Sequence, residues 1–178
     1  MIRNITHNKY SLERFFSLSP DIICIAGFDG YFKKINPALS NLLGYSKEEL
    51  LENPIQNFIH DDDVLPTTIS IQALKNNTPL VNFQNRYITK NGDIVWLSWS
   101  SIPEDREDVV YAIAKNITHL KTVENERNNL LRNLTSLNSR LKKFSYMVSH
   151  DLRSPVSNII SLFELLDLSQ VNDPDTRE

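Results

Sequence analysis

The residue pair in this sequence best suited to chemistry is His150 followed by Asp151, within the stretch S-H-D-L-R-S-P at 149–155. A neutral imidazole attacks through one ring nitrogen only when the other nitrogen carries the proton. A neighbouring carboxylate can fix that tautomer and stabilise the cation that develops. Asp151 is the candidate for this role. A lone His-Asp pair on a helix is by default a solvated surface pair, so the surrounding sequence has to decide between the two interpretations.

Three weaker candidates lie earlier in the chain. His60 precedes the three aspartates 61–63; these are metal-ligand types, but acidic residues also favour the positive end of a helix dipole. We expect this group to start and cap a helix, and we predict no metal site. Cys24, the only cysteine, lies in an apolar run and is expected in the core. Trp96 and Trp99 fall on opposite faces of one strand, so one is expected in the core and the other against a partner or the following helix.

The elements that would position these residues are strands and short helices as far as residue 118. The short apolar run 22–28, the turn signal Asp29-Gly30 and the following Y-F-K-K-I-N predict a hairpin within 22–36. Three helix starts are predicted, by an N1 proline, a capping box and an acidic run: Pro37, Ser46 with Glu49, and Asp61. Three later segments alternate with the period of strands: 81–89, 94–103 and 109–118. The prediction is an α+β fold, a five-stranded antiparallel sheet with helices inserted after its second strand.

Five sequence pieces in this region carry a family resemblance through their order and spacing: D-G-Y-F-K-K-I-N-P-A, L-L-G-Y-S-K-E-E-L-L, F-I-H-D-D-D, K-N-G-D-I-V-W-L and A-K-N-I-T. Together they make residues 10–118 resemble a PAS domain. The resemblance implies a non-catalytic sensing or dimerisation module that passes a conformational bias into the helix after its last strand. A small ligand of unknown identity and unknown binding residues stays open. No haem or flavin is expected, because residues 64–77 lack a His and Cys24 is not on the helix where such domains hold a flavin.

From Leu120 the sequence lacks glycine, and it lacks proline until Pro155, which predicts one long helix. Its apolar residues recur at alternating spacings of three and four, with Arg127 in the remaining slot: Leu120, Val123, Leu130, Leu134, Leu137, Leu141, Phe144 and Val148. These a and d positions predict a parallel coiled-coil dimer. The alternative is a single amphipathic helix on its own sheet, which would bury little with so narrow a stripe. After Val148 two steps of four form a stutter.

The stretch S-Y-M-V-S-H-D-L-R-S-P-V-S-N-I at 145–159 closely resembles the phospho-accepting helix of sensor histidine kinases. The His, the acid, the Arg and the Pro all stand at the family's offsets. The resemblance implies that His150, at heptad position c, accepts phosphate from ATP on a separate domain and donates it to an Asp of a response-regulator receiver domain. Asp151 would orient and activate His150. Ser154 stands where many members have Thr or Asn, a position associated with dephosphorylation, and is a candidate phosphatase position.

The predicted organisation is an N-terminal helical cap, a PAS sensor domain, a coiled-coil signalling linker and the first helix of a phosphoacceptor domain, at 1–19, 20–118, 119–148 and 149–178, with a loop from Asp167. All four glycines precede residue 100, so no glycine-rich nucleotide loop can follow. We therefore expect a histidine kinase by family, of the EC 2.7.13.3 type, that is inactive alone, with ATP and Mg²⁺ bound only by a catalytic domain outside these residues. The expected partners are a second copy, a receiver domain and that ATP-binding domain. The rival reading is a non-enzymatic PAS adaptor that dimerises through its helix.

The bulk composition is consistent with this interpretation. The formal net charge of -3 gives no basic footprint for nucleic acid. No run approaches the roughly 18 apolar residues of a membrane span, and the N-terminus lacks a signal-peptide pattern. A single apolar-flanked cysteine argues for a reducing compartment. We expect this part of the protein to be cytoplasmic, with an upstream membrane anchor in a longer protein left open.

Overall fold

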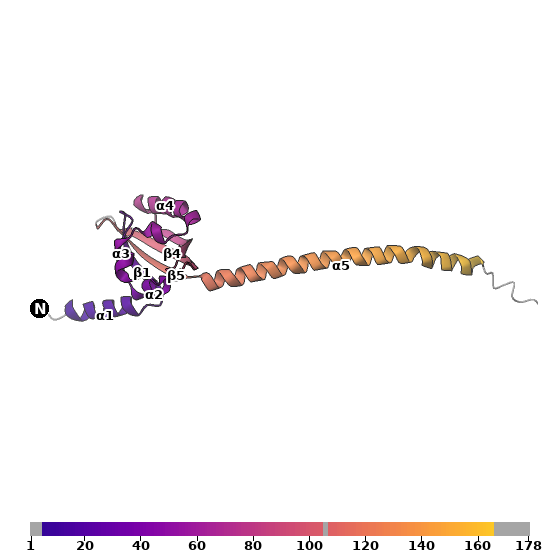
Figure 1. Ribbon diagram of the computed structural model, residues 1–178, viewed down its shortest axis with the longest axis horizontal. Coiled ribbons are helices and arrows are strands. Elements are labelled where there is room, and N and C mark those ends of the chain that lie inside the picture. Colours follow the sequence, from indigo (N-terminus) through magenta and orange to yellow (C-terminus); the bar gives the residue numbers. More distant parts are fainter. Residues whose placement is uncertain (1–4, 105–106, 166–178) are drawn as a thin grey trace, which may run out of the picture. The chain divides into compact units, whose positions relative to one another are not determined.

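The computed structural model describes the backbone of residues 5–104 and 107–165 and the side chains of residues 12–104 and 107–164. The chain divides into two units, Met1–Val123 and Glu124–Glu178, and each is described by itself. The elements follow one another (Figure 1) as α1 (Ile5–Leu18), β1 (Ile22–Gly27), β2 (Phe32–Ile35), α2 (Pro37–Leu43), α3 (Lys47–Glu52), η1 (Ile55–Phe58), α4 (Asp61–Lys75), β3 (Leu80–Ile88), β4 (Ile94–Glu104), β5 (Val109–Asn116) and α5 (Thr118–Leu165).

The five strands form one antiparallel sheet in the order β2-β1-β5-β4-β3. β1 and β2 are joined by a tight turn in which Gly30 has a φ of 85°, a conformation that glycine adopts without steric cost. The chain then leaves the sheet for α2, α3 and α4, returns at β3, and closes the sheet when β5 pairs between β1 and β4. The predicted α+β fold is confirmed.

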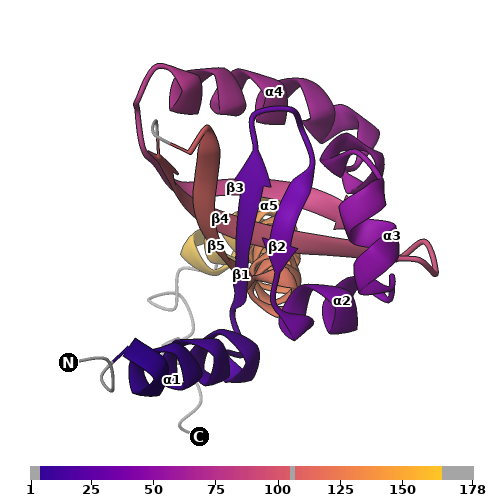
Figure 2. The ribbon, with the colours of Figure 1, turned by 90° about the vertical axis from the view of Figure 1, so that its left-hand side faces the viewer.

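The hydrophobic core lies between one face of this sheet and the helices α2, α3 and α4, which Figure 2 shows grouped against the sheet. Alternate strand residues supply the sheet side, as the two-residue period requires: Ile22, Cys24, Tyr87, Leu97, Trp99, Ala112 and Ala114. Leu39, Leu43 and Leu50 supply the helical side and are fully buried. Burial of each such leucine stabilises the fold by about 1.5–3 kcal/mol, so the leucine spacing is what fixes the helices on this face.

The predicted helix signals act as expected. Pro37 is the first residue of α2, and Gly44 ends that helix in the left-handed conformation with a φ of 77°. At α3 the Glu49 N–H donates to Ser46 Oγ over 3.1 Å, and the Ser46 N–H donates to Glu49 Oε2 over 2.8 Å. This reciprocal pair is a capping box. α4 begins at Asp61, as the acidic run predicts.

The last element, α5, is one unbroken helix that contains Pro155 and confirms the predicted long helix. The apolar residues of its predicted seam are all exposed or nearly so, from Leu130 through Leu141 to Val148. A single α5 therefore leaves an apolar stripe in water. The loop predicted from Asp167 lies outside the described residues. Within the described part of the chain, no helix combines the length and apolar character needed to cross a membrane.

Candidate functional site

His150 and Asp151 lie side by side on α5, both largely in solvent. Their side chains are 68% and 72% exposed, and His150 Nδ1 lies 3.3 Å from Asp151 Oδ1. In the tautomer with the proton on Nδ1, the imidazole donates to Asp151 and the lone pair of Nε2 faces water. This is the arrangement that a nucleophilic imidazole requires. A group this exposed can be reached by another protein domain.

Two further side chains stand one helical turn from His150. The Tyr146 ring stacks beside the imidazole, with 6.4 Å between the ring centroids and 26° between the planes. Sequence reasoning missed this contact, although the i,i+4 spacing of two rings on a helix was the available signal. Ser154 follows on the other side of His150 and is exposed, so its hydroxyl is accessible to water.

A second candidate site is a small cavity between the sheet and α4, with a volume of about 80 Å³. It has room for several water molecules or a small ligand. Its wall is mainly apolar and includes a buried polar network. The Trp99 indole N–H donates to Asn85 Oδ1 over 2.9 Å, and Asn85 Nδ2 donates to Thr67 Oγ1 over 3.0 Å. Cys24 also lines this cavity; it is buried, as predicted, and burial raises the pKa of its thiol to about 12.

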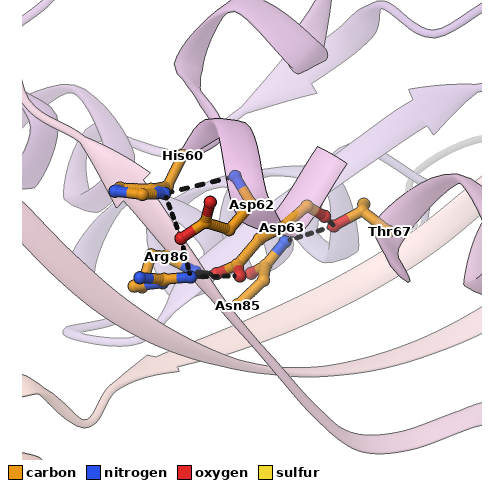
Figure 3. A network of polar contacts seen from close by, with 6 residues as sticks. All are labelled: His60, Asp62, Asp63, Thr67, Asn85 and Arg86. Atoms are coloured by element: carbon orange, nitrogen blue, oxygen red, sulfur yellow. Dashed lines mark hydrogen bonds and ion pairs between the residues drawn. The ribbon is translucent and has the colours of Figure 1, made fainter. Parts of the chain in front are cut away.

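Two of the three aspartates after His60, Asp62 and Asp63, are held by Arg86 at the start of α4 (Figure 3). Asp63 accepts hydrogen bonds from the Arg86 backbone N–H at 2.7 Å, from Nε at 2.9 Å and from Nη2 at 2.7 Å, while Asp62 accepts a second bond from Nη2 at 3.2 Å. The side-chain hydrogen bond from Arg86 holds the pKa of Asp63 below its usual value. His60 Nδ1 accepts the Asp62 backbone N–H over 3.3 Å, which makes His60 the cap of α4.

The capping role predicted for this group is therefore confirmed. Arg86 was not foreseen as its partner, because the contact depends on how β3 lies beside α4. Among the residues that the structure describes, no three His, Cys, Asp or Glu side chains are grouped to hold a metal ion.

The two tryptophans of β4 lie on opposite faces, as predicted. Trp99 is buried in the core. Trp96 lies on the outer face, where the Lys121 ammonium of α5 stands 5.2 Å from its ring centroid. The Trp96 backbone also holds the junction to α5, because its N–H donates to Thr118 Oγ1 over 2.9 Å and its carbonyl accepts the Ile117 N–H over 2.9 Å.

Comparison with known proteins agrees with this architecture. Residues 32–117 match the family model described as the PAS fold. Hybrid signal transduction histidine kinase L of Dictyostelium discoideum is 28% identical over 151 residues, which cover 83% of this chain and 8% of that protein. The probable diguanylate cyclase DgcE of Escherichia coli (strain K12) is 28% identical over 141 residues, which cover 76% of this chain and 13% of that protein.

Among solved structures, a domain of the sensory box sensor histidine kinase/response regulator from Geobacter sulfurreducens matches with a TM-score of 0.55 at 21% identity. This match covers 65% of this chain and 99% of that one. At this identity it shows the fold alone. The chain spans only 8% and 13% of the length of the two curated relatives. Both of those alignments are longer than residues 1–117 and so include part of α5.

Proposed function

From the premise that this chain carries a PAS domain followed by one long helix, with a histidine kinase among its relatives, we propose that it is the sensory and phospho-accepting part of a two-component histidine kinase. The PAS domain biases a dimeric α5, and α5 presents His150 for phosphorylation from ATP and for transfer to a receiver aspartate. The relatives alone do not select this output, because one is a histidine kinase and the other a probable diguanylate cyclase.

The observation that carries the proposal is the exposed His150–Asp151 pair in its S-H-D-L-R-S-P context. A PAS protein with a cyclase output domain, or one that only dimerises, does not require a nucleophile on this helix. The neighbouring carboxylate, the outward heptad position and the Arg and Pro at the offsets of the phospho-accepting helix all suit a histidine that has to meet two different domains in turn.

The chemistry follows from the two ring nitrogens. Nε2 of His150 forms a bond to the γ-phosphorus of ATP while the bond from that phosphorus to the bridging oxygen breaks, releasing ADP. The Nδ1–H stays hydrogen-bonded to Asp151, whose negative charge offsets the imidazolium. When a carboxylate oxygen of a receiver aspartate attacks the phosphorus, the P–N bond breaks and the imidazole returns to its neutral form. Asp151 therefore acts on the nucleophile in both directions.

The proposed dimer follows from the exposed seam of α5. A helix with this stripe is marginal alone in water, and pairing two copies removes the stripe from solvent. Pairing also places His150 on the outside at position c. The second copy, the ATP-binding domain and the receiver domain are the proposed partners.

The decisive test is phosphate labelling of this chain fused to the second helix and ATP-binding domain of a histidine kinase. We expect acid-labile, base-stable label from γ-labelled ATP, and its loss in His150→Gln. His119→Gln is the matched control, because His119 lies on the same helix and is exposed but is followed by leucine. Label that persists in His150→Gln and disappears in another variant would move the acceptor elsewhere and refute the assignment.

A second candidate function is a non-enzymatic PAS dimerisation module that passes its bias to another kind of output domain. The match to a probable diguanylate cyclase across the PAS domain and part of α5 favours it. The same labelling experiment separates the two, because a module of this kind leaves His150 unlabelled while dimerisation through α5 persists.

A further inference from the structure

The contacts of Arg86 connect two places that the fold otherwise separates. One is the wall of the cavity between the sheet and α4, on the core face of the sheet. The other is the first turn of α5, on the outer face. Arg86 belongs to β3, an edge strand, so its side chain can reach around the edge toward α4 while it stays opposite Trp96 in the register with β4.

The inner part of this connection is buried. Thr67 lines the cavity, and its Oγ1 donates to the Asp63 carbonyl over 2.6 Å and accepts from Asn85 over 3.0 Å. The hydroxyl has one proton, which is committed to Asp63. A cavity occupant that accepts a hydrogen bond from Thr67 therefore takes this proton away from the Asp63 carbonyl. Such a replacement acts directly on the turn of α4 that carries Asp63.

The middle part transmits that change. One Asp63 carboxylate holds both the backbone and the guanidinium of Arg86, through three hydrogen bonds of 2.7–2.9 Å. Its side chain is only 15% exposed, so water does not readily replace Arg86. A shift of the first turn of α4 thus moves the charged fork of Arg86 along with it.

The outer part consists of two cations at one indole. The Arg86 guanidinium carbon lies 5.5 Å from the Trp96 ring centroid, and Lys121 Nζ lies 5.2 Å from it. Both contacts are within cation–π range. The charge of Arg86 is offset by Asp62 and Asp63 in this arrangement. A shift of Arg86 together with those carboxylates changes its position at the Trp96 ring and so the field at Lys121, in the first turn of α5.

We propose that Arg86, through Trp96, couples the cavity wall to the start of α5 and thereby regulates how the helix presents His150. Only the regulation of His150 presentation rests on the proposed function. The coupling itself, from Thr67 to the first turn of α5, is a property of the PAS domain and can be measured without phosphate transfer.

The test is hydrogen exchange at the α5 junction, where the amides of Ile117, Thr118 and Lys121 all donate to described acceptors. Thr67→Val removes the hydroxyl at nearly constant shape. We expect it to change the exchange rates of these amides by at least about fivefold, the lower end of typical couplings between sites. Ser70→Ala is the matched control, since Ser70 also lines the cavity but its hydroxyl donates to the carbonyl of Pro66, within its own helix.

Thr67→Val is also made in an Arg86→Met background, which completes a double-mutant cycle. The proposal requires that, in this background, the change in exchange rates caused by Thr67→Val falls to the size of the change caused by Ser70→Ala. An unchanged effect would show that the signal bypasses Arg86, and no effect in either background would show that cavity and helix are uncoupled. If Arg86→Met fails to fold, as judged by its melting curve, Trp96→Leu replaces it and has to give the same loss of coupling. These results stand whether or not His150 is found to be labelled.

Discussion

At the residue scale, Asp63 shows how one carboxylate serves both local and tertiary structure. It lies in the acidic first turn of α4, where negative charge is favourable, and it also holds Arg86 across the sheet edge. Because Arg86 keeps the pKa of Asp63 below its usual value, the carboxylate stabilises the native state above its unfolded-state pKa of about 3.9. That stabilisation is lost as the pH falls through the lower, native pKa.

Asp63→Asn should therefore destabilise the protein by about 1.5–3 kcal/mol at pH 7, the range for hydrogen bonds to charged groups. The difference from the parent chain should shrink as the pH falls below about 4. Urea unfolding midpoints between pH 7 and pH 2.5 measure both quantities. Asp61→Asn, in the same turn, is the control and should have a small effect. A difference for Asp63→Asn that stays constant down to pH 2.5 would contradict the assigned ion pair.

Cys24 offers a second residue-scale prediction. Burial raises the pKa of its thiol to about 12, so at pH 8 the native state holds almost no reactive thiolate. Iodoacetamide should label the native chain slowly and the chain in 8 M urea rapidly. Because Cys24 is the only cysteine, intact-mass spectrometry counts the labelled fraction without mapping. Rapid stoichiometric labelling of the native chain would place this thiol outside the core.

The residues that sequence reasoning placed correctly act through local rules. The Ser46–Glu49 box and the Gly44 helix end need only their own neighbours along the chain. By contrast, Thr67 lies 18 positions from its partner Asn85, and Asp63 lies 23 positions from its partner Arg86. No local sequence pattern specifies these pairs, because they form only when β3 and α4 pack side by side in the folded protein.

At the element scale, α5 carries an apolar seam without a described partner surface. Leu134 and Leu141, both predicted at a positions, are 62% and 66% exposed. The pattern predicted the helix correctly because its 3-4 spacing is local. The short η1 was not predicted, since it depends on the burial of Phe58 in the core rather than on a helical repeat.

Replacing Leu134 and Leu141 together by Asp should raise the dimer dissociation constant by at least about a hundredfold, or ~2.7 kcal/mol. In the proposed dimer, each substitution places like charges face to face in a desolvated seam. Sedimentation velocity over a concentration series measures this effect. The control is Ser136→Asp with Ser139→Asp, which adds the same charge at outward heptad positions on the same helix. An equal loss of dimer in both pairs would mean that net charge, rather than the seam, controls association.

At the scale of the whole molecule, α5 begins in the unit that contains the PAS domain and continues without a break into the second unit, which carries His150. The sequence motifs predicted the PAS fold correctly, because the order of the motifs along the chain is also the order of the strands and helices. The motifs could not predict the contacts of Arg86 with Asp63 and Trp96, since these contacts join residues that are distant in sequence. If α5 transmits the bias of the PAS domain as a rigid element, the heptad phase must match at its two ends.

Insertions near Leu130 test that requirement in the fusion with a second helix and an ATP-binding domain. Seven extra residues return every side chain to the same face of a supercoiled helix. Two extra residues rotate the downstream seam by about 200°, since a helix advances about 100° per residue. We therefore expect seven-residue insertions to keep labelling of His150 sensitive to Thr67→Val, while two-residue insertions fix labelling at a high or low level. Labelling that stays equally sensitive in both series would make α5 a flexible tether, whatever the coupling measured at its first turn.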